Sequence, residues 1–246
     1  MPENQKVWRN IIAILLAVAG LLLVATIPVA QADPAPKILP LDSSPYGNTY
    51  GEWSARWWQW LMAIPAATNP NLDTTGINCA VDQSGPVWFL AGSFGGTAIR
   101  HCTVPAGKAL LMTPLTQLDG AGALDCDPTV PGVLCNINTL RALAAAFADD
   151  PTTLEVTVDG HQVQNVGNYR VQSPVFSITY PDNNVLSFLA GTEIPSGTYT
   201  PNVSDGYWLL LAPLSAGAHT IHLKAVTNPT VGSFPVEVTW HLTITP

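Results

Sequence analysis

Two groups of residues in this sequence have types and spacings that could support chemistry. The first is AGSFG at 91–95, a variant of the turn that exposes a nucleophilic serine in hydrolases, here Ser93. A serine hydrolase also needs an acid and a histidine, and Asp205 followed by His219 or His222 has a suitable order. The residues after the turn are strand-like, whereas this motif requires a helix there. A glycine turn between two strands is therefore the alternative interpretation.

The second group lies on two strands expected at 218–226 and 236–245. Side-chain alternation places His222 on one face of the first strand, and Glu237 and His241 on the polar face of the second. If the strands pair, opposed side chains lie ~4.5–5.5 Å apart and could hold a divalent metal ion or exchange a proton. The alternative is an ordinary solvated sheet face. The sequence has no HExxH, EF-hand, P-loop or dinucleotide-binding motif, and no cofactor is predicted.

The element expected to organise the fold is the segment TYGEWSARWWQWLMAIP at 49–65, which holds four of the eight tryptophans. Thr49 and Glu52 have the spacing of a capping box, and Pro65 cannot continue a helix, so a helix is predicted over 49–64. Steps of three and four place one apolar set on one side of it: Tyr50, Trp53, Trp57, Trp60 and Ile64. That stripe is expected to pack against a sheet.

Trp58 points away from this stripe, which leaves two interpretations of the aromatic residues. They form a core face, or Trp58 with Tyr46 or Tyr50 forms an exposed platform for a sugar ring or a protein partner. Arg100 is a further candidate, because so few residues of this chain are charged. It either lines a pocket or anchors loops through backbone carbonyls.

The first 32 residues have the pattern of a secretory signal. Lys6 and Arg9 precede an apolar run at 11–27, and AQA at 30–32 has the form of a cleavage site. An uncleaved anchor is the alternative. The expected location is secreted or periplasmic, with no further membrane span. The net charge of −8 without a basic cluster argues against nucleic acid as a partner.

All four cysteines follow the expected signal, at Cys79, Cys102, Cys126 and Cys135. An even number in an exported chain indicates disulfides. We favour pairing Cys79 with Cys102 and Cys126 with Cys135, although three connectivities are open. The spacings do not match a zinc site.

The remainder of the chain predicts a mainly β fold. Residues 33–48 are a proline-rich arm, and 49–246 are expected to form one domain with a sub-boundary near 151. A second helix is predicted over 136–150, where Pro151 ends it. Short runs rich in valine, threonine and aromatics predict strands at 87–91, 99–104, 109–113, 154–158, 161–166, 175–180, 185–190, 207–212, 218–226 and 236–245. The fold class is therefore an antiparallel β-sandwich or jelly roll with two flanking helices.

Four blocks of the sequence resemble stretches of uncharacterised secreted bacterial proteins. They are YGEWSARWWQW, GPVWFLAG, CTVPAGKAL and DGYWLLLAPLSAGAHTIHLKA. The resemblance covers most of the chain after the signal and implies that these blocks form one architecture. It transfers no activity and no catalytic residue.

The function expected from these observations is non-catalytic binding. The ligand would be a polysaccharide, another extracellular polymer or a surface partner, bound through exposed aromatics and long loops. An extracellular hydrolase of glycans or esters, with a site near Ser93 and His222, is the alternative, and a structural protein of the cell envelope is a second alternative.

Overall fold

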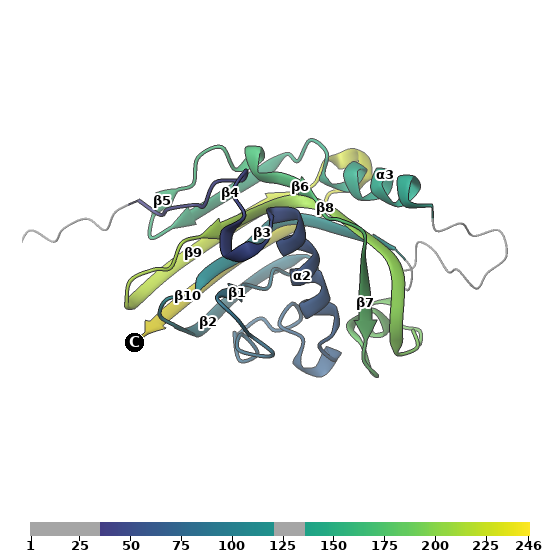
Figure 1. The fold of residues 1–246 in the computed structure, drawn as a ribbon, viewed down its shortest axis with the longest axis horizontal. Helices are drawn as coiled ribbons and strands as arrows, with labels where there is room; N and C mark the ends of the chain where they lie inside the picture. The colour runs from purple at the N-terminus through teal and green to yellow at the C-terminus, as the bar shows by residue number, and fades with distance from the viewer. Residues whose placement is uncertain (1–34, 121–135) are drawn as a thin grey trace, which may run out of the picture. The chain divides into compact units, whose positions relative to one another are not determined.

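Two five-stranded sheets form the framework of the described residues, 35–120 and 136–246, in the computed structural model (Figure 1). The first sheet has the order β1 (Val87–Phe89), β3 (Ala109–Gly120), β8 (Gly197–Leu211) and β6 (Arg170–Gln172), and β7 (Phe176–Tyr180) also pairs with β8. The second has the order β2 (Gly96–Pro105), β10 (Pro235–Thr245), β9 (Gly217–Val226), β4 (Thr153–Val158) and β5 (His161–Gln162). The predicted fold class is confirmed.

Two of the strand pairs are parallel, which an antiparallel sandwich does not predict. β1 pairs with β3, and β2 pairs with β10, in parallel. The reason for the first pair is that the chain leaves the first sheet after β1, runs through β2 in the second sheet, and returns to form β3. Such a crossover brings a strand back in the same direction as the strand it started from.

The first sheet is buried on both faces. Leu209 and Leu211 of β8 pack between the two sheets with Trp240 and Leu223, whereas their neighbour Leu210 packs on the opposite face. A strand covered on both sides is expected to read as a continuous apolar run, as this segment does. The second sheet is buried only on its inner face. Along β9 and β10, the buried residues of that face therefore alternate with the more exposed, mostly polar residues of the other face.

Helix α2 (Tyr50–Met62) covers the outer face of the first sheet (Figure 1). The predicted capping box is present: Thr49 N–H donates to Glu52 Oε2 at 2.7 Å, and Glu52 N–H donates to Thr49 Oγ1 at 3.3 Å. Trp53, Trp57 and Trp60 are buried, as the apolar stripe predicts. Trp57 packs against Trp208 from β8, and Trp53 and Trp60 pack against Phe89 from β1, which ties the helix to the sheet.

Two further helices lie beside the sheets. Helix α3 (Ile137–Ala148) begins at the cap residue Asn136, close to its predicted bounds. Helix α4 (Val185–Ala190) occupies a segment predicted as a strand, and that prediction is wrong. Asn184 caps α4 by accepting from Ser187 N–H at 2.9 Å, and Gly191 ends it in the left-handed conformation. These two local signals outweigh the apolar run that suggested a strand.

The predicted strand at 161–166 is also shorter than expected. Only His161–Gln162 is paired, and a 3-10 helix follows at Val166–Tyr169. The two-residue turn before it is present, because Val158 pairs with His161 and both Asp159 and Gly160 have positive φ.

One disulfide joins Cys79 and Cys102, whose Cα atoms are 5.8 Å apart, as predicted. Cys126 and Cys135 lie outside the described residues, as does the expected signal at 1–32. Residues 35–246 group into one compact unit. Within the described part of the chain, no helix has the length and hydropathy needed to cross a membrane.

Candidate ligand cavity

A cavity of about 250 Å³ lies beside α2, next to the first sheet. Its wall comes from segments far apart in the sequence. Helix α2 contributes Trp57, Trp58 and Met62, and α4 contributes Leu186 and Leu189. Strand β3 contributes residues 113 to 118. The other lining residues come from loops and further elements: Asn71, Gly92, Ser93, Phe94, Phe147, Phe234 and Val236. Most of these side chains are apolar, as in most small-molecule sites.

The tryptophan wall is fixed by both packing and hydrogen bonds. Trp57 packs edge-on against Trp58, with ring centroids 5.1 Å apart. Trp57 Nε1 donates to the carbonyl of Leu90 at 3.1 Å, and Trp58 Nε1 donates to Thr116 Oγ1 at 3.4 Å. Because both indole N–H groups are engaged, this wall offers a ligand aromatic ring surface rather than hydrogen-bond donors.

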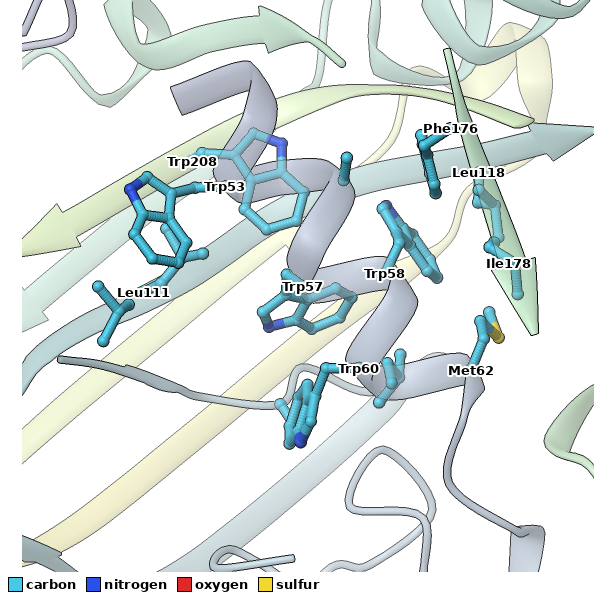
Figure 2. Close-up of a cluster of buried hydrophobic side chains, with 14 of the residues drawn as sticks. Trp53, Trp57, Trp58, Trp60, Met62, Leu111, Leu118, Phe176, Ile178 and Trp208 are labelled. Carbon is cyan, nitrogen blue, oxygen red and sulfur yellow. The ribbon is translucent and has the colours of Figure 1, made fainter. Parts of the chain in front are cut away.

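Figure 2 shows how the tryptophans of α2 divide between two directions. Trp58 points toward Leu118, Phe176 and Ile178, whereas Trp57 lies on the side of Trp208. Helix α2 therefore has apolar neighbours on more than the one side that its main stripe predicts.

An irregularity in β3 forms the second wall. The register between β3 and β8 shifts between Met112 and Leu115, and Pro114 lies within this shift. Proline has no N–H for the ladder, and such irregularities commonly redirect side chains beside functional sites. Thr113 and Thr116 thereby both reach the cavity wall. Pro114 follows directly on the strand predicted at 109–113, whereas β3 continues through it to Gly120, so the proline is the sequence signal that could have indicated this irregularity.

Helix α4 forms a third wall and is held by one buried side chain. Asn184 Nδ2 donates to the carbonyls of Pro181 at 3.2 Å and Ile194 at 2.8 Å, while its Oδ1 caps α4. Ala66 N–H, just after α2, donates to the carbonyl of Asn183 at 2.9 Å. These bonds tie the α4 segment to the end of α2, so Leu186 and Leu189 have fixed positions at the wall.

Three residues of the wall carry buried polar atoms without a hydrogen-bond partner in the described structure: Asn71 Oδ1, Ser93 Oγ and Thr113 Oγ1. A buried polar atom left unpaired costs ~1–3 kcal/mol, so proteins rarely leave several together. Rotation about the Cα–Cβ bond would redirect the hydroxyl of Ser93 or of Thr113 within the wall. The described residues of the wall include no Asp, Glu, His, Lys or Arg. The cavity thus combines apolar surface with a few neutral polar groups.

The structure does not bring Ser93 together with the histidines proposed for it. Ser93 lies at the cavity, whereas His222, His241 and Glu237 lie on the exposed face of the second sheet. No side chain of the described wall could take the proton of Ser93. The residues that follow Ser93 enter β2 rather than a helix, as the alternative interpretation of a glycine turn expects.

The histidine group forms only in part. His222 Nε2 lies 3.6 Å from Glu237 Oε1, and His222 Nδ1 lies 3.0 Å from Thr239 Oγ1. His241 instead stacks on His101, with ring centroids 4.9 Å apart. Among the described residues, no group of three or more His, Cys, Asp or Glu side chains has the geometry of a metal site. His222 thus approaches Glu237 as predicted, whereas His241 is not part of the same contact, and the three side chains do not form one cluster.

Asp205 and His219, the other residues nominated for hydrolysis, have separate structural partners. Arg170 Nε lies 2.8 Å from Asp205 Oδ1. His219 Nδ1 lies 2.7 Å from Asp159 Oδ2, and its Nε2 lies 3.0 Å from the carbonyl of Ser215 and 3.4 Å from the Ser215 hydroxyl. None of these contacts joins Asp205 or His219 to Ser93, so the described structure does not assemble the three residues into one hydrolytic site.

The expected exposed aromatic platform is absent at Trp58. Its side chain is 6% exposed, and the expectation that it faces solvent is wrong because β3 and β7 pack on its side of α2. Trp58 stays a candidate ligand-binding residue, because its side chain lines the cavity. Tyr46 is 43% exposed, in a short 3-10 helix at Pro45–Gly47 before α2.

Arg100 is 1% exposed and anchors two loops rather than facing a ligand. Its Nε donates to the carbonyl of Asp73 at 2.6 Å, and its Nη1 donates to the carbonyl of Ala91. Burial lowers the pKa of Arg100 to about 10, which the nearby charge of Asp73 partly opposes. These two contacts fit the alternative that Arg100 anchors loops through backbone carbonyls, although its buried Nη2 has no hydrogen-bond partner among the described residues.

Comparisons with protein-family models, curated proteins and solved structures give no match to this chain. The resemblance to uncharacterised secreted proteins therefore stays a prediction.

Proposed function

We propose that this protein is a binding protein whose cavity beside α2 takes one small, uncharged and mostly apolar molecule. The observation that carries the proposal is the cavity of about 250 Å³ whose described wall is free of charged side chains yet includes three unpaired polar atoms. A dry cavity of ~150 Å³ can hold benzene, so this one suits a ligand of one or two rings.

The chemistry of the wall narrows the ligand class. An ion would lose its hydration without gaining an opposite charge, which costs far more than burying a neutral group. The aromatic surfaces of Trp57 and Trp58 favour a flat ring. The hydroxyls of Ser93 and Thr113 favour a ligand with one or two hydroxyl, carbonyl or amide groups, because a ligand oxygen could accept from either hydroxyl.

A small ligand fits this geometry better than the polymer expected from the tryptophans. Polymer binding relied on an exposed Trp58, which instead lies in the wall. Hydrolysis at Ser93 lacks a base among the described wall residues. An exported location, secreted or periplasmic, remains part of the proposal, and the disulfide between Cys79 and Cys102 supports it because such bonds persist in oxidising compartments.

The test uses small neutral aromatics against their charged analogues. Indole and 2-naphthol would be compared with indole-3-carboxylate and 2-naphthoate, by ligand-observed NMR and by tryptophan fluorescence. We expect saturable binding of the neutral compounds, and at least about tenfold weaker binding of the carboxylates because the ion is not compensated. Equal binding of both classes, or of neither, would contradict the proposal.

Two matched variants locate the site. Leu189→Trp adds bulk at the cavity, whereas Leu143→Trp makes the same change on α3 away from it; the two leucines are 46% and 48% exposed. We expect Leu189→Trp to weaken binding of 2-naphthol at least tenfold and Leu143→Trp to leave it unchanged. Equal effects of the two variants would place the ligand elsewhere.

A further inference from the structure

The exposed face of the second sheet carries two histidines in direct register. His101 on β2 is paired with His241 on the neighbouring strand β10. Both side chains are exposed, and their rings stack with centroids 4.9 Å apart and planes 25° from parallel. Residues opposed in a sheet have fixed backbone positions, so the two imidazoles are held side by side before any ligand arrives.

The neighbouring strand β9 orients one of these rings. Thr220, which pairs with His241, has its Oγ1 3.4 Å from His241 Nδ1. A hydrogen-bond partner on one ring nitrogen settles which nitrogen remains for a ligand, here Nε2 of His241. His222 and Glu237 form a separate contact on the same face, at 3.6 Å. Three of the five histidines thus lie on this one face.

We propose that His101 and His241 together bind one divalent transition-metal ion, such as Cu²⁺, Ni²⁺ or Zn²⁺, with water completing its coordination. Neutral imidazole is a preferred ligand of these ions, whereas Ca²⁺ and Mg²⁺ require oxygen ligands that this pair lacks. The last side-chain torsion of histidine is broad, so small rotations can turn a nitrogen of each ring toward a common ion. Two ligands already held together lose little freedom on binding.

The electrostatic setting favours a cation at this face. The chain has a formal net charge of −8, and a negative protein attracts cations to its surface. The described residues offer no third side chain in metal-binding geometry at the pair. The ion would therefore keep open positions that exchange water or accept a ligand from outside, unlike a closed structural zinc site.

The proposal is tested by calorimetric titration of the untagged, disulfide-intact protein with Cu²⁺ or Ni²⁺. Loss of a residue that only orients a metal ligand typically lowers metal affinity about 10–100-fold. His101→Ala and His241→Ala each remove a proposed ligand itself, so each should weaken binding at least tenfold. His161→Ala is the matched control, because His161 is also exposed but lies on β5 at the hairpin. It should bind as the unaltered protein does.

Spectroscopy separates this pair from other ligand sets. The electron paramagnetic resonance spectrum of the Cu²⁺ complex should show coupling to two nitrogens, falling to one in His241→Ala. His222→Ala should leave two nitrogens. Unaltered affinity in both His101→Ala and His241→Ala, or loss of binding in His161→Ala, would overturn the proposal. Circular dichroism and the melting temperature of the metal-free variants would check that each is folded.

Discussion

The indole Nε1 of Trp58 lies 3.4 Å from Thr116 Oγ1, and the same hydroxyl lies 3.1 Å from the carbonyl of Asp205. This chain of contacts runs from α2 through β3 to β8. It joins the helix to the two central strands of the first sheet at the edge of the cavity. Trp58 is therefore part of both the core and the proposed binding wall.

Replacing Trp58 by alanine is expected to destabilise the protein strongly. Its buried side chain leaves a large void, and such truncations cost ~3–5 kcal/mol. Urea denaturation measures the loss. Tyr46→Ala, at the exposed aromatic residue, is the control and should stay within ~0.5 kcal/mol of the unaltered protein. If Trp58→Ala had the same free energy of unfolding as the unaltered protein, the indole of Trp58 would not contribute to the core.

The buried carboxylate of Asp205 should depend on Arg170. The guanidinium contacts Asp205 Oδ1 at 2.8 Å and Asp149 Oδ1 at 2.6 Å, and the hydrogen bond to Asp205 raises the pKa of Arg170 above its ordinary value. Arg170→Met leaves a buried charge unpaired, which typically costs ~3–5 kcal/mol in the free energy of unfolding. Chemical denaturation measures it.

A neighbouring arginine provides the comparison for Arg170. Arg141 donates to Gln172 Oε1 at 3.3 Å and to the carbonyl of Ser173 at 3.1 Å, but pairs with no carboxylate in these contacts. Arg141→Met should therefore cost only ~0.5–1.5 kcal/mol. Equal losses in the two variants would mean that the ion pair with Asp205 contributes nothing specific.

Asp73 should make stability depend on pH in the acid range. Burial raises the pKa of Asp73, but hydrogen bonds from Asn78, Thr75 and Gly76 outweigh it, so the net pKa is lowered. A carboxyl whose pKa is lowered on folding stabilises the protein above the unfolded pKa of about 4, and this stabilisation is lost as the pH falls further.

The measurement is urea denaturation from pH 6 to pH 2 for the protein and for Asp73→Asn. The difference in unfolding free energy between them should be constant above about pH 4 and should shrink below it. A difference that does not change over this range would show that the loop hydrogen bonds do not depend on the charge of Asp73.

Removing the disulfide between Cys79 and Cys102 should destabilise the loop that follows α2. The bond closes 23 positions of sequence, for which the chain-entropy model gives about 3 kcal/mol. The double variant Cys79→Ala with Cys102→Ala isolates this bond, whereas a reductant would act on every cysteine. Thermal melting without reductant measures the loss, and a melting temperature equal to that of the unaltered protein would rule out the expected contribution.

The elements with strong local signals were predictable from the sequence. Thr49 and Glu52 mark the start of α2, and Asp159 with Gly160 marks the turn between β4 and β5, because each signal acts within a few residues. The segment at 185–190 shows the limit of this reasoning. Its apolar run suits a short strand or a short helix, and the cap at Asn184 decides between them.

The cavity could not be predicted in the same way. Its wall combines Trp58, Ser93, Thr113 and Leu189, which come together only through the packing of α2, β3 and α4. Helical spacing identifies the main apolar stripe of α2, but it does not show that β3 and β7 cover Trp58 on another side of the helix. The opposed pair of His101 and His241 was missed for a related reason, since the parallel pairing of β2 with β10 joins distant parts of the chain.

That parallel pairing also bears on how the protein reaches its native state. Gly96 meets Val236, so β2 gains its strand partner only when a segment from the other end of the described chain arrives. The entropy of closing so long a loop is lost before the contacts are made, which makes folding slow relative to helical proteins of similar size. Until β10 docks, β2 has no strand partner on either side, and self-association during this interval competes with correct assembly.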